Sequence, residues 1–253
     1  MQGFREWYLL RNMVHRELRM RYKGSVLGFF WSLVNPIMLM VVYTVIFQFV
    51  MRVEVPDYSL YLMAGLLPWN MVTVAVANSV PVVVGNANLV KKIYFPREIL
   101  PISVVLANFV HLLIGMGLFV LFLLLTGKTT GSQLWLLPIV AAQQLLLTMG
   151  ISLLVSASYV YFRDLEHIMN LIMMVWFYLT PIVYPSFMVP EGLRWMLILN
   201  PMAPIVAGYR QALLGAESVA LSALQWPFVL SVLMAFLGFR VFRGLSRRFA
   251  EEV

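Results

Sequence analysis

A short polar stretch, Gly85 to Pro101, holds a group of charged and aromatic residues between two long apolar segments. It reads GNANLVKKIYFPREILP. Asn86 or Asn88 is of a residue type that caps a short helix, and Pro96 is expected to end that helix or turn the chain. Such a loop is suited to docking on a soluble partner. The alternative is an ordinary connecting loop whose lysines only set membrane topology, and this stretch alone leaves both open.

Residues that could carry out catalysis do not come together in the sequence. His15, His111 and His167 are far apart and lack the spacing of metal ligands, and no acidic residue lies in the middle of an apolar segment. The chain has no cysteine, which excludes disulfides, thiolate metal sites and a cysteine nucleophile. We therefore expect neither a metal site nor an enzyme active site in this chain.

A nucleotide site is not expected either. The string Gly127-Lys128-Thr129 resembles the end of a P-loop, but that motif needs a glycine where the chain has Phe122. The topology derived below also places this string on the side of the membrane that lacks ATP. An energy source for any work by this protein should therefore lie in another chain.

The composition is that of an integral membrane protein. Of the 253 residues, 62% are hydrophobic and only 11% are charged, whereas soluble domains average about 25% charged residues. The net charge of +7 could suggest nucleic acid, but the positions of the basic residues indicate membrane topology instead, so no nucleic-acid partner is expected. The first apolar run begins near Val26 and is too long for a cleavable signal peptide, so we expect it to remain as a span.

Apolar runs long enough to cross a hydrocarbon core of about 30 Å predict an all-α fold with six transmembrane helices. We expect residues 1–253 to form a single transmembrane domain. The expected spans are 26–51, 60–84, 100–126, 133–161, 168–184 and 224–242.

The first segment, residues 1–24, predicts an amphipathic helix lying in the membrane interface. At about 100° per residue, a basic stripe lies beside an aromatic stripe. The aromatic residues would face the lipid and the basic ones the anionic headgroups. The alternative is a solvated helix that only marks the inner side. The residues assigned to this helix surface are Arg5, Trp7, Tyr8, Arg16 and Arg19.

The distribution of Lys and Arg predicts that both termini and the stretch Gly85 to Pro101 are cytoplasmic. Fourteen of the eighteen basic residues fall on the side of the termini, and positive residues favour the inside. The four assigned to the outer side are Arg52, Lys128, Arg194 and Arg210.

Residues 190–215 are too apolar for a free outer loop. Asn200-Pro201 and Pro204 divide them into two pieces of about ten residues, each long enough as a helix to reach half-way into a bilayer. We predict a re-entrant helical hairpin that packs against the bundle or lines a path, because backbone at membrane depth needs such a setting.

A few polar residues fall inside the expected spans, namely Asn108, His111, Gln143 and Gln144. They could be functional, because polar groups in a bilayer are costly, or they could hydrogen-bond between helices. The scarcity of acids and bases at mid-membrane argues against a proton- or ion-coupled carrier.

Aromatic residues make up 14% of the chain. Rings near the interfaces form the aromatic belt of many membrane proteins, whereas rings inside a pore could stack on the apolar faces of sugars. The residues considered for a substrate path are Trp31, Tyr43, Phe47, Trp69, Tyr161, Phe177, Tyr178 and Tyr184.

Six motifs spread along nearly the whole chain carry a resemblance to a known family. The chain resembles the membrane subunits, or permeases, of bacterial ABC exporters that move O-antigen, teichoic acid or capsular polysaccharide. Each motif is weak alone, and their shared order makes the set specific. The motifs are RYKGSVLGFFWSLVNP (Arg21 to Pro36), GLLPWN (Gly65 to Asn70), KKIYFPREILP (Lys91 to Pro101), YFRD (Tyr161 to Asp164), TPIVY (Thr180 to Tyr184) and NPMAPIVAGYRQALLG (Asn200 to Gly215).

The resemblance implies a homodimer in the bacterial cytoplasmic membrane, with two separate ATPase subunits that bind ATP and Mg²⁺. Its first cytoplasmic loop would hold the coupling helix that docks on the ATPase, which maps here to Asn88 to Glu98. The substrate would be a lipid-linked glycan that passes aromatic rings. The coupling candidates are Lys91, Lys92, Tyr94, Phe95, Arg97 and Glu98.

Two other functions remain as alternatives. An ABC exporter of drugs or lipids would share the topology and the coupling loop, although the polysaccharide-type motifs argue against it. A membrane-embedded enzyme of cell-envelope synthesis would need a cluster of carboxylates or histidines, and none is evident.

Overall fold

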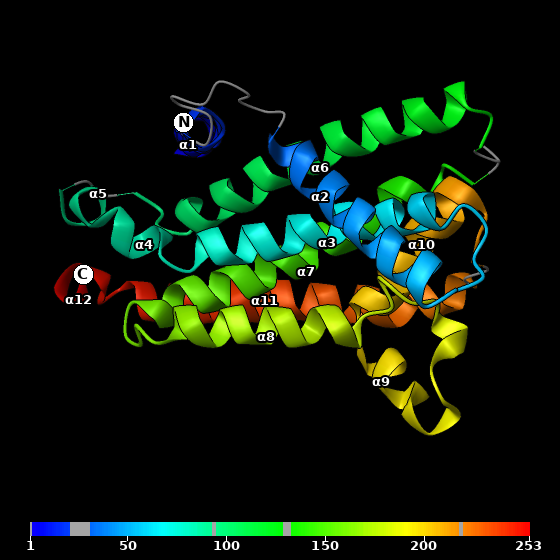
Figure 1. Ribbon diagram of the computed structural model, residues 1–253. Coiled ribbons are helices and arrows are strands. Elements are labelled where there is room, and N and C mark those ends of the chain that lie inside the picture. The colour runs from blue at the N-terminus through cyan, green and yellow to red at the C-terminus, as the bar shows by residue number, and fades with distance from the viewer. Residues whose placement is uncertain (1, 21–30, 93–94, 129–132, 218–219) are drawn as a thin grey trace.

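The computed structural model describes residues 2–20, 31–92, 95–128, 133–217 and 220–253, and every regular element in these ranges is a helix (Figure 1). The longer helices lie side by side along one direction. The helices are α1 (Gln2–Met20), α2 (Trp31–Tyr43), η2 (Thr44–Val50), α3 (Tyr58–Ser79), α4 (Val82–Gly85), α5 (Ala87–Lys92), α6 (Ile99–Leu125), α7 (Leu136–Tyr159), α8 (Leu165–Leu179), η3 (Ser186–Met188), η4 (Glu191–Leu193), α9 (Arg194–Leu199), α10 (Met202–Leu214), η5 (Leu221–Leu224), α11 (Gln225–Ser246) and α12 (Phe249–Glu252).

Four helices, α3, α6, α7 and α11, are long and apolar enough to cross a membrane. Two shorter apolar helical segments, Val34–Val50 and Leu165–Leu179, correspond to the first and fifth expected spans. The structure thus confirms an all-helical chain rich in apolar helices. Part of the first expected span, residues 26–30, lies outside the described residues.

Prolines set two helix ends that differ from the expected spans. The second span was expected to continue to residue 84, but α3 ends at Ser79 and a separate short helix follows Pro81, which has no N–H to continue the helical ladder. The fifth span was expected to reach residue 184, but α8 ends at Leu179. Thr180 is extended, as a residue before a proline tends to be.

Helix α3 lies at the centre of the bundle and is buried along most of its length. Buried amides tie it and its neighbours together: Gln144 Nε2 donates to the carbonyl of Pro68 at 2.8 Å, and Gln143 Nε2 donates to the carbonyl of Leu224 at 2.9 Å. Both glutamines therefore make hydrogen bonds between helical segments, which is one of the two roles that the sequence left open.

Helices α7 and α11 pack with their backbones in direct contact. A Cβ built on Gly150 would lie 2.6 Å from the backbone nitrogen of Ala235 and closer still to the carbonyl of Met234. A Cβ on Gly238 would meet the backbone of Gly150 in the same way. Small residues allow such close approach between membrane helices.

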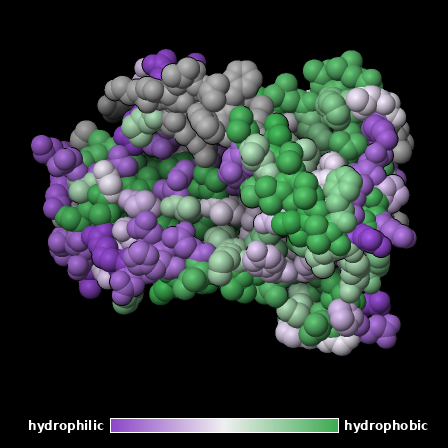
Figure 2. Space-filling view, viewed as in Figure 1, coloured by the Kyte–Doolittle hydropathy of each residue, from purple (hydrophilic) through white to green (hydrophobic). Residues whose placement is uncertain are grey.

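The two ends of the bundle differ in character. Helices α1, α5 and α12 lie toward the same end, and α1 is seen end on, across the direction of the long helices (Figure 1). Hydrophilic residues gather around α5 and α12, while a broad apolar surface covers the region of α2 and α10 (Figure 2). Hydrophilic residues also lie along the opposite edge of the view, so the apolar surface is bounded at both ends (Figure 2). Such a bundle, with an amphipathic helix at one end, is suited to a membrane.

The predicted hairpin of residues 190–215 contains two helices separated by Asn200-Pro201. They are unequal: α9 has six residues and α10 has thirteen. Helix α10 is mostly buried against α3 and α7, whereas α9 projects from the bundle (Figure 1).

Candidate functional site

Five of the aromatic residues proposed for a substrate path form one connected cluster. The ring of Phe177 stacks on Tyr43 at 5.9 Å between centroids and also contacts Trp69 at 5.7 Å and Tyr178 at 5.2 Å. Phe47 joins through Tyr43 at 6.3 Å. The cluster is assembled from α2, η2, α3 and α8, so residues far apart in sequence converge. We call Tyr43, Phe47, Trp69, Phe177 and Tyr178 the aromatic cluster.

Exposure differs within the aromatic cluster. Trp69 is buried, Tyr43, Phe47 and Phe177 are half-buried, and the side chain of Tyr178 is 58% exposed. Tyr184, also proposed for the path, donates its hydroxyl to the carbonyl of Tyr178 at 2.7 Å. Tyr178 therefore has an exposed ring, and the hydrogen bond from Tyr184 anchors its backbone.

Tyr161, also proposed for the path, lies away from this cluster. Tyr161 lies near the C-terminus, where its hydroxyl donates to the carbonyl of Leu245 at 3.1 Å and its ring lies 6.3 Å from Phe249. It ties the end of α7 to the tail of the chain. The side chain of Trp31 lies outside the described residues.

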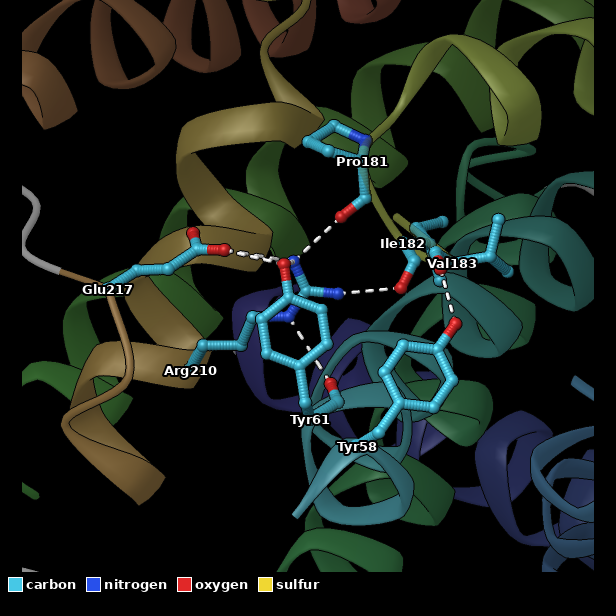
Figure 3. A network of polar contacts seen from close by, with 7 residues as sticks. All are labelled: Tyr58, Tyr61, Pro181, Ile182, Val183, Arg210 and Glu217. Carbon is cyan, nitrogen blue, oxygen red and sulfur yellow. Dashed lines mark hydrogen bonds and ion pairs between the residues drawn. The ribbon is translucent and has the colours of Figure 1, made fainter. Parts of the chain in front are cut away.

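A fully buried arginine joins α10 to the turn after α8 (Figure 3). Arg210 donates through Nη1 to the carbonyl of Pro181 and through Nη2 to the carbonyl of Ile182, both at 2.7 Å. Its Nε donates to the carbonyl of Tyr61 at 3.2 Å, and its guanidinium carbon lies 3.5 Å from the centre of the Tyr61 ring. The carbonyls of Pro181 and Ile182 lie in the turn after α8, outside regular helix hydrogen bonding, and the cation supplies their donors.

Glu217 balances the charge of this arginine. Its Oε1 lies 3.3 Å from Nη1 of Arg210 and accepts a hydrogen bond from the hydroxyl of Tyr61 at 2.7 Å. Tyr58 adds a hydrogen bond from its hydroxyl to the carbonyl of Val183. We call Tyr58, Tyr61, Arg210 and Glu217 the arginine network (Figure 3).

Asn200 holds the other end of the same turn. Its Nδ2 donates to Oγ1 of Thr180 at 2.9 Å, and its Oδ1 accepts from the indole of Trp176 at 2.8 Å and from the backbone of Met202 at 3.0 Å. One side chain therefore joins α8 to the start of α10. Together with Arg210, it fixes the position of the turn between α8 and the hairpin.

The coupling candidates lie on and after the short helix α5 (Ala87–Lys92), and the expected helix does not reach Glu98, since Phe95 to Glu98 form a bend and a turn. Lys91 and Lys92 are exposed, whereas Phe95 is half-buried against an apolar cluster of this chain. Asn86 directly precedes the helix, and its side-chain Nδ2 donates back to the carbonyl of Val82. Tyr94 lies outside the described residues.

The end of α11 holds the coupling candidates that follow Phe95. Glu98 forms an ion pair with Arg243 at 3.0 Å, and Arg97 donates to the carbonyl of Ser246. The tail is itself anchored by Phe249, which is fully buried beside Phe242. Any movement of this segment would therefore be shared with the C-terminal end of the chain.

Helix α1 packs on α6 and also contacts the segment before α5. Nη2 of Arg16 donates to Oδ1 of Asn86 at 3.0 Å, so this residue, proposed to face headgroups, is engaged within the chain. Trp7 and Tyr8 are 64% and 60% exposed, and Arg19 is exposed as well. The side chain of Arg5 lies outside the described residues.

Comparison with known proteins identifies the family. Residues 8–214 match the ABC-2 type transporter family of membrane proteins. The chain belongs to this family. It is therefore a multi-pass membrane protein of a transport family, and the apolar helices of the bundle agree with that assignment.

Relatives with known names cover nearly the full length of this ABC-2 chain. It is 36% identical over 248 residues to the O-antigen export system permease protein RfbA of Klebsiella pneumoniae, covering 96% of this chain and 94% of the relative. It is 32% identical over 247 residues to the protein of the same name from Myxococcus xanthus, with 97% and 95% covered. Identity to the polysialic acid transport protein KpsM of Escherichia coli is 22% over 235 residues, with 90% of each chain covered.

Arg210 has a role in this ABC-2 chain that was not predicted from the sequence. The count of basic residues only assigned Arg210 to the outer side of the membrane, whereas the structure shows that its side chain is fully buried and bonded within the bundle. A usable signal was present, because Arg210 is a lone charge within the apolar stretch IVAGYRQALL, and such charges are rare and are usually paired.

The described part of the chain offers no metal site, since no three His, Asp or Glu side chains in it converge. Lys128, from the string that resembles a P-loop, instead contacts both carboxylate oxygens of Asp57 at 2.8 Å.

Proposed function

We propose that this chain is the membrane subunit of an ATP-driven exporter that moves a lipid-linked polysaccharide across the bacterial cytoplasmic membrane. The observation that carries the proposal is the full-length similarity to O-antigen export permeases from two organisms. A drug or lipid exporter of the same architecture is disfavoured, because the named relatives are O-antigen and polysialic acid transporters.

The arrangement of the exporter follows from the same proposal. Two copies of the chain, each with six spans, would enclose the path, and residues 190–215 would enter the membrane from the outer side. The end that carries α1, α5 and α12 would face the cytoplasm, as the excess of basic residues favours. Two separate ATPase subunits would bind ATP and Mg²⁺ and dock on this end.

The aromatic cluster is our proposed contact for the sugar chain. Aromatic faces attract the apolar C–H surfaces of sugar rings, and they do so without requiring one particular sugar. Tyr178 has the most exposed ring of the cluster and the backbone contact from Tyr184 that limits its movement. A polymer of repeating sugars could move past such a surface without encountering a strong site at any one step.

We expect Tyr178→Ala to lower export about two- to tenfold, the range that loss of one aromatic contact allows. The measurement is surface polysaccharide in a strain whose own gene is deleted and replaced by each variant. Phe122→Ala is the matched control, because Phe122 is 50% exposed on α6 outside the cluster. A deletion strain with normal surface polysaccharide would overturn the proposed function, whereas equal export by the two variants would only remove Tyr178 from the path.

We expect Phe95→Ala to weaken association with the ATPase subunit more than Lys91→Ala does. An aromatic side chain that becomes buried in an interface typically contributes on the order of 2 kcal/mol, whereas an exposed charge at the rim contributes far less. Phe95 is half-buried and Lys91 is exposed, which makes them a suitable pair. The measurement is the amount of ATPase that co-purifies with each variant at equal membrane expression. If both variants retain the same amount of ATPase, the segment Lys91 to Glu98 is an ordinary connecting loop.

A further inference from the structure

A groove of about 420 Å³ lies beside the arginine network, between α9 on one side and α10 with the start of α11 on the other. Its lining is mainly apolar and small, with Ala203, Ala207 and Ala223 on one wall and Ile198 opposite. The size and lining are those of a site for an apolar ligand. Neither the aromatic cluster nor the coupling candidates contribute to this groove.

Glu217 supplies a charged oxygen to this otherwise apolar groove. The hydrogen bonds from Tyr61 and Arg210 both reach its Oε1, and the other carboxylate oxygen is turned away from the guanidinium (Figure 3). A carboxylate can accept about four hydrogen bonds, so capacity remains for a ligand. Among the described residues that line the groove, none is basic.

The side chains around the groove indicate that it faces lipid. Helix α11 exposes apolar side chains along most of its length, as expected for a span that faces lipid. Trp226, at the start of α11, lines the groove and is 48% exposed, and tryptophan is enriched at the level of lipid headgroups. An apolar groove at this level opens toward lipid, with its carboxylate near the headgroups.

From this geometry we propose that the groove binds a single phospholipid whose headgroup carries a primary ammonium, as in phosphatidylethanolamine. An acyl chain would lie against the alanine wall, and the ammonium would donate a hydrogen bond to Glu217. A headgroup with net negative charge would be repelled by the carboxylate of Glu217, because none of the described residues lining the groove is basic. A choline headgroup carries the positive charge but has no N–H to donate.

The test measures the lipid bound to the full-length chain, with any subunits that co-purify. The purified protein is titrated with mixed micelles of dioleoyl phosphatidylethanolamine, phosphatidylcholine or phosphatidylglycerol, and retained lipid is counted by native mass spectrometry. We expect one phosphatidylethanolamine per chain, bound about tenfold more tightly than phosphatidylglycerol, which is the scale of one charge-assisted hydrogen bond. Equal retention of all three lipids would overturn the headgroup assignment.

Two variants separate the headgroup contact from the groove itself. Glu217→Gln should lower phosphatidylethanolamine binding to the level of phosphatidylglycerol. Ala223→Phe should fill the groove and reduce binding of every lipid, whereas Val232→Phe, at an exposed position of α11 outside the groove, should change nothing. Unchanged binding in Ala223→Phe would overturn the site, even if Glu217→Gln fails to fold. Disulfide crosslinking between two Ala223→Cys copies would overturn it in favour of a second chain as occupant.

Discussion

Gly150→Ala is expected to disrupt the packing of the bundle, although it adds only one methyl group. The new Cβ would overlap the backbone of α11 at Met234 and Ala235. A backbone cannot change rotamer to make room, so the two helices would have to separate along their shared contact. Overpacking typically costs about 1–3 kcal/mol and occasionally more, and we expect Gly150→Ala at the upper end of this range. Gly238→Ala should have a similar effect, because its Cβ would meet the backbone of Gly150.

Two glycines of the same chain provide matched controls. A Cβ added to Gly117 in α6 or to Gly244 in α11 would have no other atom within 4 Å beyond its own helix backbone and chain neighbours. Gly117→Ala and Gly244→Ala should therefore be neutral or should stabilise by up to about 1 kcal/mol through helix propensity. The measurement is the thermal unfolding midpoint in detergent, together with the amount of folded protein in membranes. Equal midpoints for Gly150→Ala and Gly117→Ala would show that α7 and α11 are not in backbone contact.

Arg210→Met is expected to destabilise the chain by about 3–5 kcal/mol, the range found when one partner of a buried charge pair is removed. The loss would leave Glu217 without its cation, and the carbonyls of Pro181 and Ile182 without their donors. Arg210→Lys should recover only part of this loss. The ammonium keeps the charge but cannot reproduce the planar fork that reaches several acceptors at once.

Arg194→Ala is the matched control for this prediction, because Arg194 belongs to the same hairpin but is exposed. Its ion pair with Glu191 spans 3.5 Å, with side chains 54% and 89% exposed, and such surface pairs contribute about 0–1 kcal/mol. The measurement is the unfolding midpoint in detergent, with protease sensitivity of the turn after α8 as a local readout. A fully stable Arg210→Lys variant would mean that charge alone matters and that the guanidinium geometry does not.

The sequence by itself determined the features that depend on neighbouring residues. Apolar runs predicted the long helices, because a span must satisfy its own backbone within one continuous segment. The expected third span, 100–126, agrees closely with α6 (Ile99–Leu125). The proline at position 181 was equally visible, but the expected fifth span continued past it, and the helix in fact ends two residues before. The resemblance carried by six ordered motifs led to the family that the comparisons confirm.

Only the tertiary structure decided which polar and aromatic side chains meet. Arg210 and Tyr61 are 149 positions apart, and Arg16 and Asn86 are 70 apart. Packing of the helices brings each pair together, and no local pattern specifies it. The same holds for the aromatic rings: eight were named from the sequence, and packing gathered five of them while placing Tyr161 beside the C-terminal tail. Residue type indicated what each side chain could do, whereas helix packing, which depends on the shapes of several helices at once, decided which partner it found.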